Sequence, residues 1–89
     1  MMELREYKHI YFLGIGGIGM SALAKLCLQL GIDVSGYDRQ SSTITDQLTS
    51  QGAEIHFDDE PASIAGIPQL VIYTPAIPQD SKIRNYFIH

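Results

Sequence analysis

Gly14-Ile15-Gly16-Gly17-Ile18-Gly19 is a G-x-G-x-x-G run that follows an apolar stretch at residues 9–13 and precedes a helical pattern. Glycines in this order between a strand and a helix are typical of a phosphate-binding turn. Gly14 permits the tight turn, Gly16 lets the backbone approach a pyrophosphate, and Gly19 lets the helix pack close to the sheet. The first N–H groups of that helix have no internal partners and favour an anion. The run predicts a ligand that carries a diphosphate; a purely structural turn is the alternative.

Length, charge and cysteine content limit the class of protein. Eighty-nine residues, of which 45% are hydrophobic, are enough for one small globular domain. The net charge of −4, without a cluster of Lys or Arg, argues against a nucleic-acid partner. A single cysteine, Cys27, fits a reducing compartment, and no apolar run approaches the roughly 18–20 residues of a membrane span. We expect a cytoplasmic domain that binds neither nucleic acid nor a membrane.

Apolar stretches alternate with helical patterns along the whole chain. Strands are expected at residues 10–13, 33–38, 54–56 and 69–74, and helices at residues 18–30, 43–51 and 61–66 and from Asp80 onward. The pattern Thr43-Ile44-Thr45-Asp46 has the form of a capping box, and Asp80 is a candidate cap of the last helix. The apolar positions of the first helix are expected in the core: Met20, Leu23, Leu26, Cys27 and Leu30.

This alternation predicts an α/β fold, a Rossmann-like three-layer parallel sheet with helices on both faces. Ligands of such sheets bind at the carboxyl ends of the strands. Three segments should therefore share one rim: residues 14–19, 38–42 and 74–78.

Several polar residues on that rim are candidate ligand contacts. Asp38 follows Gly19 by 19 residues, where an acid accepts hydrogen bonds from a ribose diol; the alternative is a loop aspartate that caps the next helix. Arg39 could contact a base or remain in solvent. The Ser21 hydroxyl could reach an anion or bond back to its own turn. Thr74 could contact a phosphate or a sugar, or hold a turn.

No catalytic or metal-binding group can be assembled from the sequence. His9, His56 and His89 lack metal-ligand spacing, and the acidic run at residues 58–60 fits the start of a helix. The sequence has no G-x-x-x-x-G-K-[ST] element to hold the β- and γ-phosphates of ATP. We therefore expect a domain that binds and has neither a catalytic residue nor a metal site.

The string His9-Ile10-Tyr11-Phe12-Leu13-Gly14-Ile15-Gly16-Gly17-Ile18-Gly19-Met20-Ser21 resembles the opening of the Mur ligases, most closely those that join L-alanine to UDP-N-acetylmuramate. Val34-Ser35-Gly36-Tyr37-Asp38 and Tyr73-Thr74-Pro75-Ala76-Ile77-Pro78 match the same family in register. NAD-binding sites in general do not require Met-Ser after the third glycine. The closest rival in the family is a ligase that recycles murein peptides.

The resemblance implies that residues 1–89 form a single Rossmann-like N-terminal domain of a three-domain ligase of peptidoglycan synthesis. This domain would bind UDP-N-acetylmuramate and adjoin the central and C-terminal domains of the same ligase. ATP and Mg²⁺ would belong to those later domains, so no cofactor is expected here. The implied substrate-binding residues are Gly14, Gly16, Gly17, Ile18, Gly19, Met20, Ser21, Asp38, Arg39, Thr74, Pro75, Ala76 and Ile77.

Two other functions remain open from the residues alone. An NAD-dependent oxidoreductase domain shares the glycines and the acid after the second strand. A regulatory nucleotide-sensing module of a transporter or channel would bind without chemistry.

Overall fold

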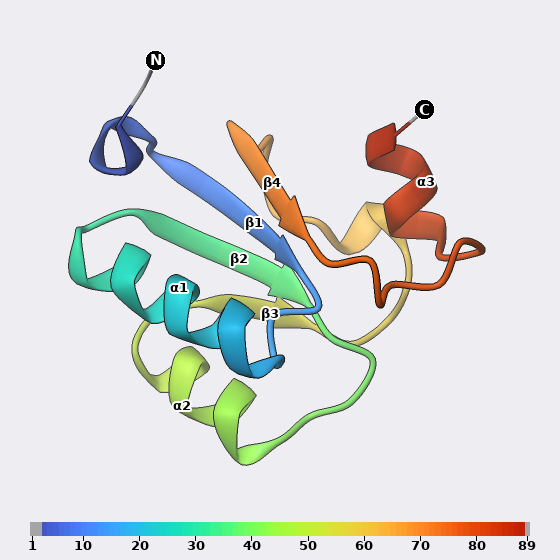
Figure 1. Ribbon diagram of the computed structural model, residues 1–89, viewed down its shortest axis with the longest axis horizontal. Helices are drawn as coiled ribbons and strands as arrows, with labels where there is room; N and C mark the ends of the chain where they lie inside the picture. The colour runs from blue at the N-terminus through green and yellow to red at the C-terminus, as the bar shows by residue number, and fades with distance from the viewer. Residues whose placement is uncertain (1–2, 89) are drawn as a thin grey trace.

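A computed structural model describes residues 3–88 and shows a four-stranded parallel sheet with helices on both faces (Figure 1). The strand order is β3-β2-β1-β4. The strands are β1 (His9–Leu13), β2 (Asp33–Tyr37), β3 (Glu54–His56) and β4 (Leu70–Tyr73). The helices are α1 (Ile18–Gln29), α2 (Thr43–Ser50) and α3 (Lys82–Ile88), and two 3₁₀ turns span Leu4–Glu6 and Pro61–Ser63. The predicted α/β fold is confirmed.

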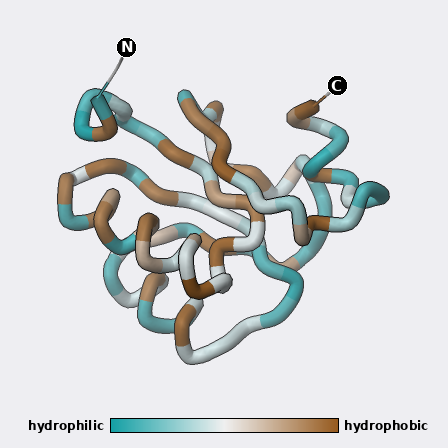
Figure 2. The backbone as a smooth tube through the Cα atoms, in the orientation of Figure 1, coloured by the Kyte–Doolittle hydropathy of each residue, from teal (hydrophilic) through white to brown (hydrophobic). Residues whose placement is uncertain are grey.

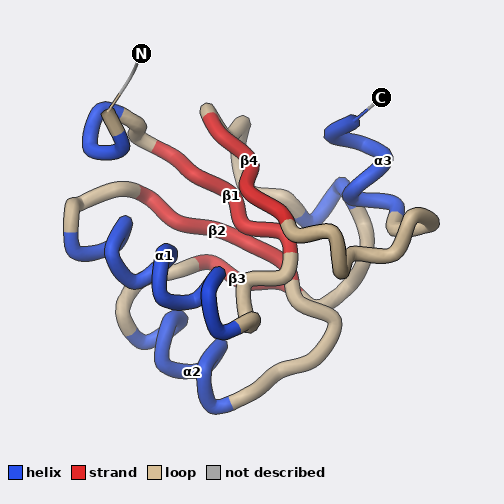
Figure 3. Tube along the Cα trace, in the orientation of Figure 1, coloured by secondary structure: helices blue, strands red, loops and turns tan. Residues whose placement is uncertain are grey.

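Side-chain alternation along β1 divides the core into two layers. Ile10 and Phe12 pack toward α1 and α2 on one face, whereas Tyr11 and Leu13 pack with Ile83 of α3 on the other. Figure 3 shows α1 and α2 together on one side of the sheet and α3 on the opposite side. Because β1 lies between β2 and β4 and is covered on both faces, residues 10–13 are all buried. The expectation of a strand buried on both faces is confirmed.

The face that α1 turns toward the sheet differs from the predicted one. Met20, Ala24 and Cys27 are buried, whereas Leu26 and Leu30 are each 43% exposed, so their placement in the core was wrong. Ser21, Lys25 and Gln29 form a polar stripe, and apolar residues cover most of the remaining surface of this helix, so its sequence excludes the stripe from the core but does not select among the other faces. The hydrophobic side chains of the sheet select the buried face instead (Figure 2 shows hydrophobic residues along β1 and β4).

Glycines and caps set the ends of the first two helices. Gly14 turns the chain out of β1 with φ 91°, and Gly31 follows α1 with φ 80°, as expected for a left-handed C-terminal stop. The capping box lies one residue earlier than predicted: Ser42 is the N-cap, its hydroxyl accepts from Thr45 N–H, and the Thr45 hydroxyl accepts from Ser42 N–H. Ser42 and Thr43 are both good caps, so the sequence alone did not distinguish them.

Two further expectations about helices need correction. The short helix expected to begin with Pro61 at its first position and to end at Gly66 does begin there, but it is the single 3₁₀ turn Pro61–Ser63. The backbone becomes extended at Ile64, with ψ 125°, so the turn does not continue to Gly66. Asp80 does not cap α3; the Ser81 hydroxyl accepts from Arg84 N–H instead. Within residues 3–88, no helix is both long and apolar enough to cross a membrane.

Candidate functional site

A cleft of about 330 Å³ opens at the carboxyl ends of the strands. It combines residues that follow all four strands, and its lining is Gly14, Tyr37, Asp38, Arg39, Asp59, Ala76, Ile77, Pro78, Asp80 and Ser81. The predicted meeting of the three rim segments is therefore present in the structure. Ligands of doubly wound sheets bind at this edge, beside the point where the strand order reverses. In the order β3-β2-β1-β4, that point lies between β1 and β4.

The glycine loop is tied to the end of β2 by its backbone. Gly14 N–H and Ile15 N–H both donate to the carbonyl oxygen of Tyr37, at 2.8 and 3.0 Å. Gly17 N–H donates to the carbonyl of Gly14 at 3.1 Å and closes the turn. These bonds fix the conformation of the glycine loop before any ligand binds. That conformation depends on the position of Tyr37 at the end of β2.

Asp38 brings its carboxylate against the glycine loop. Its Oδ2 accepts from Gly16 N–H at 2.8 Å, and its Oδ1 accepts from Gln40 N–H at 3.2 Å. The contact with Gln40 is a turn within the loop; Ser42 caps the next helix, so the alternative of an aspartate that caps that helix was wrong. The contact with Gly16 joins the second strand to the predicted phosphate turn and was not foreseen.

The first turn of α1 presents free backbone donors. Gly17 is its N-cap and supplies no side chain, so Ile18, Gly19 and Met20 have N–H groups without an intrahelical acceptor. The Ile18 side chain is 86% exposed, so this turn borders solvent. A helix start of this kind is favourable for an anion through both hydrogen bonds and the helix dipole.

Other predicted contacts have partners of their own. The Ser21 hydroxyl donates to the Ile18 carbonyl at 3.0 Å, and Ser21 lines a separate hollow between α1 and α2. The Thr74 hydroxyl accepts from Ala76 N–H at 3.2 Å and shapes the loop before Pro78. Met20 is buried at the base of α1, which leaves only its backbone for a ligand. Neither Thr74 nor Pro75 is among the residues that line the cleft.

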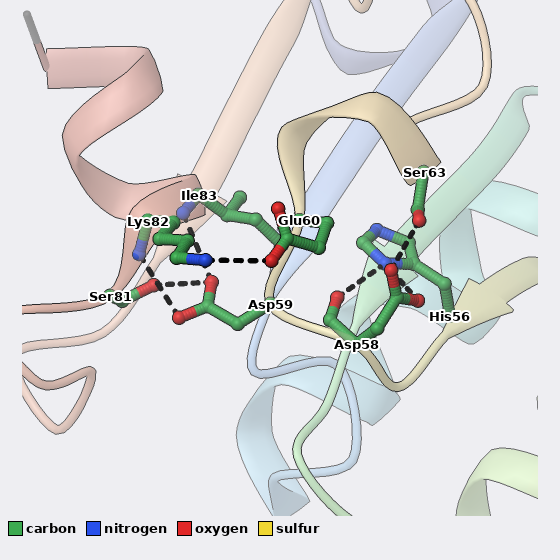
Figure 4. A network of polar contacts seen from close by, with 8 residues as sticks. All are labelled: His56, Asp58, Asp59, Glu60, Ser63, Ser81, Lys82 and Ile83. Carbon is green, nitrogen blue, oxygen red and sulfur yellow. Dashed lines mark hydrogen bonds and ion pairs between the residues drawn. The ribbon is translucent and has the colours of Figure 1, made fainter.

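Asp59 is a cleft residue that the sequence analysis assigned only to a helix start. Its carboxylate accepts from Ser81 Oγ, Lys82 N–H and Ile83 N–H, each at 3.0 Å (Figure 4). Burial alone would raise the pKa of Asp59, but these three donors and the charge of Lys82 outweigh it and lower that pKa below its usual value. Asp59 follows β3, so the rule that carboxyl ends of parallel strands meet at one edge predicts its position.

Three carboxylates and one guanidinium line the cleft, those of Asp38, Asp59, Asp80 and Arg39, so its net charge is negative. Burial, followed by the charges of Asp59 and nearby groups, raises the pKa of Tyr11, whose hydroxyl lies 2.7 Å from His56 Nε2. Burial and the charges of Asp59 and Asp38 likewise raise the pKa of Tyr37. Arg39 is the basic side chain among the cleft residues, and within residues 3–88 it forms no salt bridge. Its guanidinium is therefore available to a ligand.

The arrangement offers a ligand both hydrogen-bonding groups and charge. Carboxylate acceptors lie in the cleft, and backbone donors lie at the start of α1. Among residues 3–88, no group of three His, Cys, Asp or Glu side chains could hold a metal ion. This combination suits recognition of a ligand with a neutral polar part and an anionic part.

Comparison with known proteins identifies the family. Residues 9–87 match the family model described as "Mur ligase family, catalytic domain". The chain is 44% identical over 91 residues to a UDP-N-acetylmuramate–L-alanine ligase of Flavobacterium johnsoniae, covering 98% of this chain and 20% of that protein. It is 46% identical over 85 residues to the enzyme of the same name from Porphyromonas gingivalis, covering 90% of this chain and 19% of that protein.

A solved structure supports the same relationship. The crystal structure of a murein peptide ligase from Psychrobacter arcticus superimposes with a TM-score of 0.80 at 30% sequence identity, over 91% of this chain and 17% of that chain. The chain thus spans about a fifth of the length of the curated relatives that it matches.

Proposed function

Because the chain belongs to the Mur ligase family, we propose that it is the domain that binds the UDP part of UDP-N-acetylmuramate for an ATP-dependent ligase that adds L-alanine to the lactyl carboxylate in peptidoglycan synthesis. The single observation that carries the proposal is the cleft at the strand ends, where Gly14, Asp38 and Ile77 meet beside the uncapped start of α1.

Sequence identity favours the L-alanine ligases within the family. Identity to two named L-alanine ligases is 44% and 46%, against 30% to the murein peptide ligase. The whole enzyme would be cytoplasmic, where UDP-linked precursors and ATP are present. Central and C-terminal domains of the same protein would supply ATP, Mg²⁺ and the amino-acid site.

The charges of the protein favour different positions for the diphosphate and for the uridine of the ligand. A diphosphate is repelled by the carboxylates of the cleft and is favoured by the N–H groups that begin α1. Uridine is uncharged at neutral pH and carries donors and acceptors that suit the Asp38 carboxylate and the Arg39 guanidinium. We therefore assign uridine to the cleft and the diphosphate to the first turn of α1, where the glycine loop ends. The loop at residues 74–77 would line the path of the sugar diphosphate.

In the whole enzyme, this domain would contribute orientation. It would anchor the UDP end so that the distant carboxylate reaches the catalytic domain already positioned. The chemistry, activation of the lactyl carboxylate by ATP to an acyl phosphate and attack by the L-alanine amine, would take place on the later domains.

A calorimetric titration of the 89-residue chain tests the proposal. UDP-N-acetylmuramate and UDP should release heat on binding, whereas NAD and ATP should not. Arg39→Ala should weaken UDP binding by about 1–3 kcal/mol, the range for a hydrogen bond to a charged group. Lys25→Ala removes a positive charge from the exposed side of α1, away from the cleft lining, and serves as its control. Binding of NAD in preference to UDP would replace the proposal with an oxidoreductase domain.

A further inference from the structure

The glycine at position 16 has a structural neighbour that accounts for it without any ligand. A Cβ built on Gly16 would lie 2.7 Å from Asp38 Oδ2 and 3.2 Å from Asp38 Cγ. Separations below about 3 Å are essentially never seen for a real Cβ, so a side chain here must displace the carboxylate. The space that an alanine methyl needs at this position is taken by Asp38.

The same carboxylate occupies the Gly16 N–H. The distance of 2.8 Å from Gly16 N to Asp38 Oδ2 is that of a good charge-assisted hydrogen bond. An anionic phosphate oxygen cannot share this donor at close range with a carboxylate, since the two charges repel. Gly16 N–H is therefore unavailable to a phosphate as long as Asp38 stays in place.

We propose that Asp38 is a positioning residue for the glycine loop, and that position 16 is glycine in order to seat the Asp38 carboxylate. The carboxylate holds Gly16 from one side and Gln40 from the other, and thereby fixes the loop after β1 to the loop after β2. A carboxylate has about four lone-pair sites, so Asp38 can hold both N–H groups and still accept from a ligand. This role does not depend on the proposed function, because it exists in the free protein.

A double-mutant cycle on the unliganded chain tests whether position 16 must be glycine to make room for the Asp38 carboxylate. Gly16→Ala should lower the Tm of the parent chain by about 4–8 °C. In an Asp38→Ala background the methyl has room, so the same substitution should lower the Tm by less than half as much. Thr45 Cγ2, 3.3 Å from the built Cβ, is the competing cause. If Thr45 were responsible, the loss would be equal in both backgrounds, and that result would overturn the proposal. No loss of Tm in the parent chain would overturn it as well.

The Gly16 amide resonance provides a second test that a general loss of stability would not mimic. Asp38→Asn keeps an oxygen that can accept from Gly16 N–H, so the Gly16 resonance should stay close to its parent position. Asp38→Ala removes the acceptor and should move that resonance upfield. Asp80→Asn removes the same charge from the same cleft and should leave the Gly16 resonance in place. A Gly16 resonance that Asp38→Ala leaves unmoved, or that Asp80→Asn moves equally, would refute the positioning role.

Since no ligand is present in either measurement, failure here is distinct from failure of UDP binding. A chain that binds UDP but shows no coupling between positions 16 and 38 keeps the proposed function and loses this inference. A chain that shows the coupling but ignores UDP does the reverse.

Discussion

At the residue scale, different neighbouring groups leave no space for a side chain at different glycines. Gly36 lies in β2, where the strand pattern gives no sign of a special requirement. A Cβ at this position would lie 2.5 Å from the Phe12 carbonyl oxygen and 2.9 Å from Ile15 Cδ1. The close approach of β2 to the turn after β1 therefore leaves no space for a methyl group. The sequence predicted that residues 14–19 and 38–42 meet at one rim, but it could not predict which atoms touch there, because that depends on the exact approach of the two backbones.

We predict that Gly36→Ala lowers the free energy of unfolding by about 1–3 kcal/mol, the cost of forcing a methyl into a packed site. Urea denaturation measures the change. Gly19→Ala is the matched control, since nothing lies within 4 Å of its built Cβ; the expectation that Gly19 lets the helix pack close to the sheet was therefore wrong. In a helix that substitution should leave stability unchanged or raise it by up to about 1 kcal/mol. Equal losses from the two substitutions would show that the space around Gly36 is not the cause.

At the element scale, α3 depends on a residue that lies far from it in sequence. Asp59 accepts from the backbone of Lys82 and Ile83 and thereby caps the helix from the loop after β3. Asp59→Asn keeps one acceptor oxygen but turns an NH₂ group toward a donor, so we predict a loss of about 1–2 kcal/mol. Glu60→Gln is the control, because its exposed ion pair with Lys82 contributes little. A Glu60→Gln loss as large as that of Asp59→Asn would contradict the capping role.

The lowered pKa of Asp59 gives this contribution a pH dependence. A carboxyl group whose pKa is lower in the folded state stabilises the fold above its unfolded pKa of about 3.8, and that stabilisation is lost as pH falls through the folded value. The stability difference between the parent and Asp59→Asn should therefore be full at pH 6 and shrink below about pH 4. Thermal unfolding of both chains across this range measures it. A difference that stays constant down to pH 2 would show that the charge of Asp59 is not involved.

Helices and strands were predicted correctly where the local sequence pattern fits only one kind of structure. Residues 9–13 form a strand because a short apolar run ends at a glycine that can take positive φ. The core face of α1 was wrong at Leu26 and Leu30 because the polar stripe of Ser21, Lys25 and Gln29 leaves a wide apolar surface, and contacts with the sheet determine which part of it is buried. The predicted short helix ended as the 3₁₀ turn Pro61–Ser63 because the backbone becomes extended at Ile64.

At the scale of the whole molecule, topology accounts for the site. Parallel strands place the loops after β1, β2 and β4 at one edge, so Gly14, Asp38 and Ile77 meet in the cleft as the sequence predicted. The same rule covers Asp59 after β3, which the sequence analysis left out. The roles of these residues toward a ligand remain predictions.

The 89-residue chain should not turn over substrate. Its sequence contains no G-x-x-x-x-G-K-[ST] loop, the element that holds the β- and γ-phosphates of ATP in P-loop enzymes, so we expect it not to hold ATP and Mg²⁺ for phosphoryl transfer. Phosphate release from ATP, with UDP-N-acetylmuramate and L-alanine present, is the measurement. Release above that of a mock purification would contradict the assignment of the chain as a substrate-binding domain.

The most direct test of the central claim is a map of amide shifts as UDP-N-acetylmuramate is added to the ¹⁵N-labelled chain. The largest shifts should fall on Ile18, Gly19 and Met20, whose N–H groups would face the diphosphate, and on Asp38 and Arg39, which would lie beside the uridine. NAD added at the same concentration should leave these resonances in place. If the shifts cluster instead at the opposite end of the strands, around His9 and Glu54, or if NAD moves the glycine loop and the UDP-sugar does not, the cleft is not a UDP site.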